Sequence, residues 1–260
     1  MRLKNKVAIV TGGTAGIGRG VAAVYAQEGA LTYFTGTNAE NGRLVEEEIR
    51  QSNPAGKAVF LKADVSSAQD TKSVVETIMK ENGRIDILVS NAATSYNQYI
   101  DVMTEEQWDH TFAVNLKSVF LYANLIIPIM AKQGGGSIIN VGSVTSLTGV
   151  PKNPAYVASK TGMVGLTRAL AIDHAHQGIR VNIVCPSNVR TPRMERFLDR
   201  APDRETEMKD LMNRHLVKRM SEPEELAEFL VYLASDKAEF LTGGVYPFDG
   251  GYTAFKYMQQ

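Results

Sequence analysis

The chain has 260 residues, of which 44% are apolar and 22% are charged, and its formal net charge is zero. This length can bury a large core, and a balanced charge without a long run of Lys or Arg argues against nucleic-acid and membrane-surface partners. The single cysteine, Cys185, excludes an intrachain disulfide framework and a cysteine-rich zinc site, and the four scattered histidines predict no metal site.

Two apolar segments are candidates for a membrane segment, and neither has the pattern of one. Residues 1–10 are basic and apolar, but their apolar run meets glycines at once and is too short for a signal or spanning helix. The longest apolar run, 119–130, contains Asn124 and Pro128 and falls short of the ~20 residues that span a bilayer. We therefore expect a core helix there and a cytoplasmic protein.

Short β-branched runs alternate with longer helical patterns along the chain. The predicted strands are apolar enough to be buried on both faces, as in parallel sheets, and they cover 6–11, 30–35, 57–62, 85–90, 136–142, 180–186 and 244–248. The predicted helices lie between them, at about 16–28, 41–52, 68–81, 105–132, 155–176 and 222–234. Capping boxes at Thr104–Gln107 and Ser221–Glu224 mark two helix starts.

This alternation implies right-handed crossovers with helices on both sheet faces. The sequence therefore predicts an α/β fold, a single Rossmann-type doubly wound parallel sheet of about seven strands that spans residues 1–260 as one domain. Residues 191–219 depart from this strand–helix alternation, because they are rich in charged residues and contain scattered Met. Because segments after strand ends lie where open α/β sheets bind ligands, we expect a substrate lid there. A solvated helical hairpin fits the same composition.

The first predicted strand runs directly into TGGTAGIG (11–18), which opens a helix. Gly12, Gly16 and Gly18 are placed where the backbone must turn sharply and approach a pyrophosphate, with helix N–H groups pointing at the anion. A strand–helix turn can carry glycines without a ligand. The position after the first strand favours dinucleotide binding.

From this turn onward the chain resembles the short-chain dehydrogenase/reductase family, whose fingerprint is T-G-x-x-x-G-x-G, and further family motifs follow in family order over nearly the whole chain. SNAA (90–93) stands where the family usually shows N-N-A-G, CPSNVRT (185–191) resembles its P-G-x-x-x-T, and 241–251 resembles its C-terminal strand. Ser90, Ala93 and Ser187 depart from the pattern. The resemblance implies dinucleotide contacts from Gly12, Thr14, Gly16, Ile17, Gly18, Thr37, Asp64, Val65, Asn91, Ala92, Tyr156, Lys160, Val189 and Thr191.

Tyr156 and Lys160 are four residues apart in PAYVASK (154–160), on one face of a predicted helix. A phenol with a pKa of ~10 is too weakly ionised at neutral pH to be a ready base. If the Lys160 cation lies ~4 Å from the ionised phenol, at an effective dielectric of ~20, their attraction amounts to about 4 kcal/mol, which lowers the phenol pKa by roughly 3 units. Desolvation of both groups would reduce this effect and the positive charge of an oxidised nicotinamide would add to it, so a Tyr156 pKa near neutrality, suited to acid–base catalysis, is physically reachable. Taken alone, an exposed pair worth ~0.5 kcal/mol also explains the spacing.

The family resemblance implies that Tyr156 exchanges the proton with the substrate oxygen and that Lys160 also binds the nicotinamide ribose. It further implies that Ser143 binds the substrate oxygen and that Asn115 holds a water in a proton relay. Ser159 points off the Tyr–Lys face and is expected to take no part. The implied activity is an NAD(P)(H)-dependent interconversion of a ketone or aldehyde and a secondary alcohol. The alternatives are an epimerase or dehydratase that keeps its dinucleotide, and a non-enzymatic dinucleotide sensor.

The end of the second predicted strand bears on the choice of dinucleotide. NAD users of this architecture usually place a carboxylate there for the ribose 2′-hydroxyl, but this chain has Gly36. Nothing therefore repels a 2′-phosphate, and we expect NADP, with NAD left open, although Ala15 and Thr37 replace bases common among NADP users. Candidate partners for a phosphate are Arg19, Arg43 and Lys62, although Arg19 and Arg43 can equally be solvated helix charges. Thr37 and Asn38 could bond to a phosphate or to a hydroxyl.

Substrate contacts are expected from Ser143, Tyr156, Tyr96 and Asn153, and Tyr96 can either stack on a ring or pack the lid. The stretch 35–42 is similar to 3-oxoacyl-[acyl-carrier-protein] reductases, but a small carbonyl or alcohol compound of another class fits equally. Lid arginines could meet an acidic carrier, although Glu and Asp are interspersed among them: Arg190, Arg193, Arg196 and Arg200. Since members of the family commonly form tetramers, a homotetramer is expected, through helices 105–132 and 155–176 and the C-terminal strand.

Overall fold

The computed structural model describes residues 1–53 and 56–254, which contain a seven-stranded sheet of order β3-β2-β1-β4-β5-β6-β7. Every neighbouring pair of strands is parallel. No predicted strand end is displaced by more than two residues from the strands β1 (Val7–Val10), β2 (Leu31–Gly36), β3 (Lys57–Lys62), β4 (Ile87–Ser90), β5 (Gly136–Val141), β6 (Ile179–Pro186) and β7 (Val245–Phe248).

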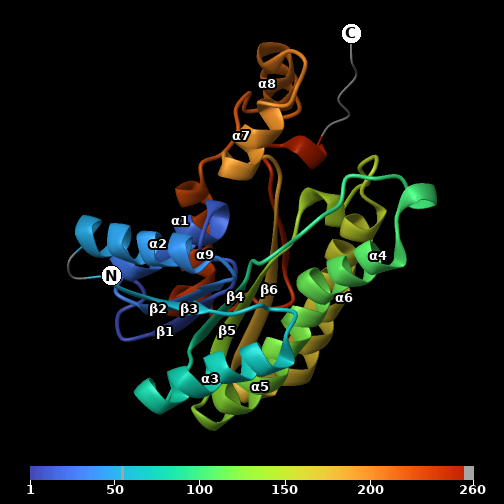
Figure 1. Ribbon diagram of the computed structural model, residues 1–260. Helices are drawn as coiled ribbons and strands as arrows, with labels where there is room; N and C mark the ends of the chain where they lie inside the picture. Colours follow the sequence, from blue (N-terminus) through green and yellow to red (C-terminus); the bar gives the residue numbers. More distant parts are fainter. Residues whose placement is uncertain (54–55, 255–260) are drawn as a thin grey trace.

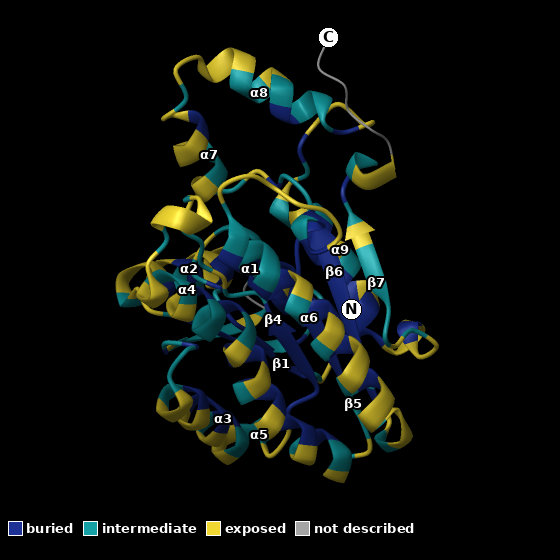
Figure 2. Ribbon diagram, turned by 90° about the vertical axis from the view of Figure 1, so that its right-hand side faces the viewer, coloured by how far each residue is buried: buried dark blue, intermediate teal, exposed yellow. Residues whose placement is uncertain are grey.

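Helices cover both faces of this sheet (Figure 1). One face carries α1 (Gly16–Gln27), α2 (Ala39–Ser52) and α9 (Pro223–Ala234). The other carries α3 (Ala68–Asn82), α4 (Glu105–Phe112), α5 (Ser118–Lys132) and α6 (Pro154–His174). The central strands are buried on both sides, as Figure 2 shows. The predicted doubly wound α/β fold is confirmed. The chain order reverses between β1 and β4, so the carboxyl ends of these strands define the ligand-binding crevice of such sheets.

The predicted helix over 105–132 is interrupted. Between α4 and α5 lies one turn of π-helix, Ala113–Lys117, a form that occurs mostly as single turns at functional sites. In the described part of the chain this segment is also the one helix long and apolar enough to cross a membrane. However, Tyr122, Ile126 and Met130 are fully buried in the cluster beneath the sheet. The segment is the core helix that the sequence predicts.

One predicted capping box is confirmed, and the other begins one residue later than predicted. At α4, Gln107 N–H donates to Thr104 Oγ1 at 3.2 Å and Thr104 N–H donates to Gln107 Oε1 at 3.1 Å, as expected. At α9 the prediction is wrong by one residue, because the N-cap is Glu222 rather than its serine neighbour. Pro223 occupies the first helical position, where its missing N–H and fixed φ are favourable, and this sets the start.

The segment after β6 forms two helices, α7 (Pro192–Leu198) and α8 (Arg204–Asn213), that project beyond the carboxyl edge of the sheet (Figure 1). They are built around a small apolar cluster of their own, in which Leu198, Leu211 and Met220 are buried. We call residues 191–219 the insertion. Its cluster is separate from the clusters that flank the sheet, so the insertion packs as a distinct unit over the crevice.

Candidate active site

The turn between β1 and α1 forms the floor of a cleft at the carboxyl edge of the sheet. Gly12 and Gly16 have φ values of 68° and 54°, in the left-handed region that favours glycine. A Cβ on Gly18 would lie 2.2 Å from the carbonyl oxygen of Gly12, so no larger residue fits. Ala15 precedes α1 without a side-chain cap in the described structure, and the first turn carries no carboxylate. The first N–H groups of α1 are therefore open to an anion.

A cleft of about 460 Å³ lies over this floor. Most of the predicted dinucleotide contacts line it together: Gly12, Thr14, Gly16, Ile17, Thr37, Asp64, Val65, Asn91, Ala92 and Thr191. Gly18 and Val189 lie behind this lining, since Gly18 packs on Gly12 and Val189 is buried in a bridge to Ser221. A glycine floor and an uncapped helix start suit a pyrophosphate, so the residues present fit a bound dinucleotide.

Asn91 fixes the end of β4 against this floor. Its Nδ2 donates to the carbonyl oxygens of Thr11 and Gly12 at 2.9 and 3.2 Å, and its backbone N–H donates to Thr11 Oγ1 at 2.9 Å. A Cβ on Gly12 would lie 2.9 Å from Ala92 Cα, so the two loops are in close contact. The departures from N-N-A-G at neighbouring positions therefore leave the contact between the end of β4 and the glycine turn intact.

The end of β2 has no space for an acidic side chain. A Cβ on Gly36 would lie 2.6 Å from Thr14 Cγ2, so a carboxylate for the ribose hydroxyl cannot be placed there. Thr37 lines the cleft directly beside it.

Two of the predicted phosphate partners are already engaged elsewhere. Arg19 forms an ion pair with Glu48 at 2.8 Å, and Asn38 Oδ1 caps α2 by accepting from the N–H of Asn41 at 2.9 Å. Among the cleft-lining residues that the structure describes, Thr37 is the one member of the predicted phosphate set. The geometry therefore does not separate the two dinucleotides.

Ser143, Tyr156 and Lys160 gather where β5 ends and α6 begins. Ser143 Oγ accepts from the N–H of Thr145 at 3.2 Å, which leaves its own hydrogen free to donate. Lys160 is 1% exposed. Its Nζ donates to the carbonyl oxygen of Val141 at 2.7 Å and lies 5.9 Å from the centre of the Tyr156 ring. A phenol, a hydroxyl and an ammonium thus lie close together at the junction of β5 and α6.

The expected lowering of the Tyr156 pKa is wrong for the protein's own groups. Burial raises the pKa of Tyr156, although a hydrogen bond with Ser143 and the charge of Arg193 act in the opposite direction. Burial also lowers the pKa of Lys160 to about 8. The ammonium is bonded to a backbone carbonyl rather than to the phenol, so desolvation outweighs the attraction that the helical spacing suggests.

Asn115 lies in the π-turn and connects two parts of the site. Its Oδ1 accepts from the N–H of Thr94 at 2.8 Å, and its Nδ2 donates to Thr94 O and to Ser159 Oγ, both at 3.0 Å. Ser159 in turn donates to the carbonyl oxygen of Tyr156 at 2.8 Å. The exclusion of Ser159 is therefore corrected: it points away from the phenol, yet it holds the Tyr156 turn to Asn115. Because both polar atoms of the Asn115 side chain are engaged, a relay water would have to use a backbone group there.

A second cavity, of about 750 Å³, lies between the insertion and the loop after β4. The predicted substrate residues Tyr96 and Asn153 both line it. The Tyr96 hydroxyl bonds to Nδ1 of His110 at 3.0 Å, and Asn153 Oδ1 is buried without a partner among the described residues. Arg193 lines this cavity and the dinucleotide cleft, so the two spaces adjoin.

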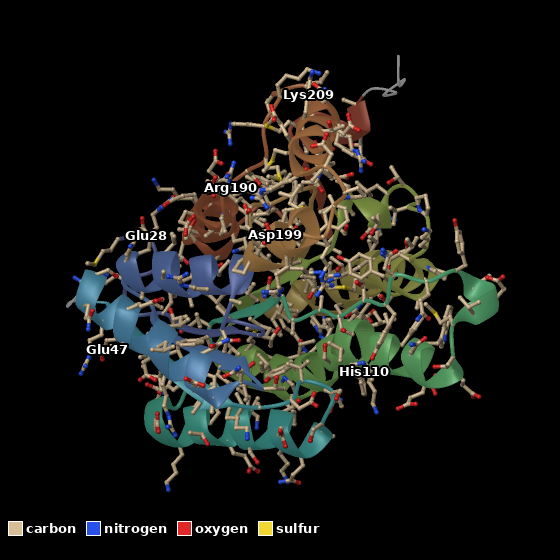
Figure 3. All side chains as sticks on the ribbon, turned by 45° about the horizontal axis from the view of Figure 1, so that its top comes forward. Glu28, Glu47, His110, Arg190, Asp199 and Lys209 are labelled. Atoms are coloured by element: carbon tan, nitrogen blue, oxygen red, sulfur yellow. The ribbon has the colours of Figure 1, made fainter. Side chains whose placement is uncertain are left out.

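His110 is a site residue that sequence reasoning missed. It lines the dinucleotide cleft from α4 and bonds to the Tyr96 hydroxyl. Figure 3 labels its position. Nothing in its sequence neighbourhood marks it, since only the packing of α4 against the loop after β4 brings it to the cleft.

The whole chain has counterparts among known proteins. A family model described as Enoyl-(Acyl carrier protein) reductase matches residues 12–253. A 3-oxoacyl-[acyl-carrier-protein] reductase of Thermotoga maritima is 38% identical, over 96% of this chain and 99% of its own. The chain belongs to the short-chain dehydrogenase/reductase family. As a short-chain dehydrogenase/reductase it is a member of a family that binds NAD(P), in agreement with the lining of the cleft.

Other relatives of this short-chain dehydrogenase/reductase cover it equally well. A cyclopentanol dehydrogenase of Comamonas sp. is 38% identical, over 97% of this chain and 99% of its own. The crystal structure of an L-sorbose reductase from Gluconobacter frateurii, complexed with NADPH and L-sorbose, superposes with a TM-score of 0.93 at 27% identity, over 98% of this chain and 100% of that one. These matches confirm the predicted fold and the predicted oxidoreductase class.

Proposed function

We propose that this short-chain dehydrogenase/reductase interconverts a ketone and a secondary alcohol, with a nicotinamide dinucleotide in the cleft and Tyr156 exchanging the proton. The observation that carries the proposal is the convergence of Ser143, Tyr156 and Lys160 at the end of β5. The strands on either side, β4 and β6, lead into Asn91 and Thr191, which line the cleft. Relatives named cyclopentanol dehydrogenase and L-sorbose reductase support this reaction class.

Each side chain has a distinct task in this mechanism. When bound, the dinucleotide supplies or accepts the hydride. The Ser143 hydroxyl, oriented by Thr145 N–H, donates a hydrogen bond to the substrate oxygen and stabilises negative charge there. Tyr156 gives its proton to that oxygen during reduction and removes it during oxidation. The Lys160 ammonium, fixed by the Val141 carbonyl, stabilises the phenolate that reduction leaves behind.

Asn115 and Ser159 act as positioning residues in this proposal. Through the Thr94 backbone they hold the loop after β4, and through the Tyr156 carbonyl they hold the first turn of α6. This network links the loop after β4 to the helical turn that carries Tyr156. We propose that a water at the Asn115 turn passes the proton on toward solvent.

We propose NADP as the preferred dinucleotide, with NAD as the alternative. The support is the end of β2, where Gly36 leaves no space for a carboxylate and Thr37 offers a hydroxyl. Nothing at that position repels a 2′-phosphate. Dissociation constants of NADPH and NADH, measured by fluorescence titration, test the choice, and binding of NADH tighter by about tenfold would contradict it.

The reaction itself is tested with a panel of ketones and secondary alcohols, followed by the absorbance of reduced nicotinamide with both dinucleotides. We expect net oxidation or reduction of at least one member of the panel with exchange of free dinucleotide. Conversion of substrate by a permanently bound dinucleotide, with no net change in its absorbance, would indicate an epimerase or dehydratase instead.

We further propose a cytoplasmic homotetramer that acts on small molecules. Two separate apolar surfaces support this assembly. Phe120 on α5 and Ile172 on α6 are 52% and 79% exposed, and Tyr232 and Phe240 are exposed near the sheet edge at β7. Two such surfaces provide two kinds of twofold interface, as a tetramer requires. Light scattering tests the assembly, and a monomeric mass would contradict it.

A further inference from the structure

Three arginines in α7 and in the turn directly after it line the cavity between the insertion and the loop after β4. Arg193 and Arg196 lie three residues apart on one side of α7, and Arg200 follows in the turn after the helix ends. We call all three the cavity arginines. Arg193 and Arg196 also border the dinucleotide cleft, so this charge lies beside the place where the reaction is proposed to occur.

The carboxylates interspersed among them do not neutralise these arginines. Glu195 and Asp199 both bind Arg204 of α8, the former at 2.6 Å. Arg190 and Arg219 each pair with a glutamate near the start of α9. Within the described ranges, by contrast, no carboxylate oxygen lies within 4.0 Å of a side-chain nitrogen of the cavity arginines. Arg190, Arg204 and Arg219, which do not line the cavity, are thus paired, whereas the three arginines that line it have no carboxylate partner among the described residues.

The balance of charge in the cavity wall is therefore positive. Among its described lining residues, Glu207 is the one acid that accompanies the three cavity arginines. A concave wall with excess guanidinium groups raises the local potential and concentrates anions. Arginine also matches the planar, two-oxygen geometry of carboxylates and phosphates.

Arg193 is the cavity arginine nearest to the chemistry. One of its terminal nitrogens donates to Ser95 Oγ in the loop after β4, so the guanidinium bridges the cavity from the insertion to the sheet. Its positive charge also reaches the phenol, where it opposes the rise in the Tyr156 pKa that burial causes. A guanidinium has five N–H donors, so this bond to Ser95 leaves others for a ligand.

We infer that the substrate is a ketone or alcohol that carries a carboxylate or phosphate group, and that Arg193 binds this group with support from Arg196 and Arg200. The inference rests on the proposed ketone–alcohol reaction of the same site. The charged group is the part of the substrate that the catalytic side chains do not contact. An uncharged cyclic alcohol, by contrast, would leave the cavity arginines without an anionic partner.

Binding can be measured without turnover. In the presence of oxidised dinucleotide a ketone cannot be reduced, so calorimetry reports its affinity alone. Two matched pairs serve as probes: 3-oxobutanoate against its methyl ester, and dihydroxyacetone phosphate against dihydroxyacetone. We expect the charged member of at least one pair to bind more tightly by about tenfold or more, and the responding pair distinguishes carboxylate from phosphate. Equal affinities within both pairs, or no measurable binding of either anion, would overturn the inference.

Substitutions of Arg193 test its role in binding the charged group. Arg193→Gln should weaken binding of the charged probe by about tenfold or more, and by at least about threefold more than binding of the neutral probe or of NADPH, and Arg193→Lys should recover part of the loss. Lys209→Gln is the matched control, because Lys209 is an exposed cation on α8 at the outer edge of the insertion, away from His110 (Figure 3). An equal loss of NADPH affinity in Arg193→Gln would assign the arginine to the dinucleotide and overturn the inference.

Two outcomes separate this inference from the proposed function. If the charged probe binds selectively but no ketone or alcohol is ever turned over, the proposed reaction fails and the anion site stands. If ketones are reduced but charge makes no difference to kcat/KM, the reaction stands and the anion site fails. A 3-oxoacyl group reduced only on an acidic carrier protein, and not as the free acid, would also overturn the inference.

Discussion

The polar groups of the catalytic centre and those of the insertion are held in opposite ways. Lys160 and Asn115 are each 1% exposed, and every polar atom of their side chains has a partner in the scaffold. The cavity arginines Arg193, Arg196 and Arg200 are exposed and lack carboxylate partners among the described residues. Reaction chemistry is thus built into the rigid sheet and its helices, whereas the means of selecting a substrate are carried by a separately packed segment.

The insertion is bonded to the carboxyl edge of the sheet both through backbone groups, such as Leu216 N–H to the Gly250 carbonyl oxygen at 2.8 Å, and through side chains. His215, at the end of the insertion, has Nδ1 at 2.9 Å from the Leu211 carbonyl oxygen, so Nδ1 must carry the hydrogen. In the neutral ring Nε2 is then an acceptor, and it lies 2.7 Å from Ser187 Oγ at the end of β6. Ser187 occupies a position where the family pattern has glycine. The departure therefore supplies the hydroxyl that ties the insertion to the sheet.

The largest effect is expected from Tyr156→Phe, which removes one oxygen from the catalytic centre. The phenyl ring preserves packing, so fold and dinucleotide affinity should stay unchanged while kcat falls by about 10³-fold or more. Steady-state kinetics, circular dichroism and NADPH titration check the three parts. If the variant kept most of its turnover, the proton-transfer assignment would fail.

Lys160→Met should separate activity from stability. We expect kcat to fall by about 10²-fold, yet the free energy of unfolding at about pH 7 should rise, because the wild type buries a charge whose pKa burial lowers to about 8. Between this pKa and the unfolded value the folded protein has released a proton that the unfolded chain retains. The free energy of unfolding of the wild type therefore rises as the pH increases from the folded to the unfolded pKa, and the extra stability of the Met variant becomes smaller.

Urea denaturation at about pH 7 and pH 9.5 measures this difference. A Met variant that is less stable than the wild type at both values would show that the Lys160–Val141 hydrogen bond outweighs the cost of burying the ammonium.

Gly18→Ala tests the cleft floor. The added Cβ would meet the Gly12 carbonyl oxygen at 2.2 Å, so the turn must shift. We expect about tenfold weaker dinucleotide binding and a loss of roughly 1–3 kcal/mol in the free energy of unfolding. Gly165→Ala in α6 is the control, because its Cβ meets nothing within 4 Å. Equal behaviour of the two variants would rule out the close approach.

Ser187→Ala is expected to have the smallest effect and to act on the insertion alone. It leaves Nε2 of His215 buried without its partner, at a cost of about 1–2 kcal/mol. Cleavage within 191–219 by limited proteolysis should become faster while cleavage of the sheet stays constant. Unchanged cleavage rates would mean that the bond does not hold the insertion.

The same attachment should respond to acid. Burial lowers the pKa of His215, although hydrogen bonds with Leu211 and Met212 and the charge of Asp249 oppose this. The attachment is then fully stable above the unfolded pKa of ~6.5 and weakens as the pH falls below it, because protonation favours the exposed ring. Proteolysis of the insertion across this range measures the effect, and a flat profile would contradict it.

Much of the site could be predicted because its signals are local. The glycines of 11–18, the strand ends and the four-residue spacing of Tyr156 and Lys160 are short-range patterns that backbone geometry imposes. The tie from Asn115 through Ser159 to Tyr156 could not be predicted, because it depends on a π-turn that places the amide toward α6. His110 was missed for the same reason, since its role follows from the packing of α4.

The sequence by itself determined the doubly wound fold, the family and the reaction class, because hydrophobic periodicity and motif order are written along the chain. Only the tertiary structure decided which charges find partners. It turned Glu195 and Asp199 toward Arg204 and left Arg193 facing the cavity, and it set the pKa of Tyr156 by burial rather than by Lys160. Pairing and desolvation depend on distances between segments that are remote in sequence, and no local pattern encodes those distances.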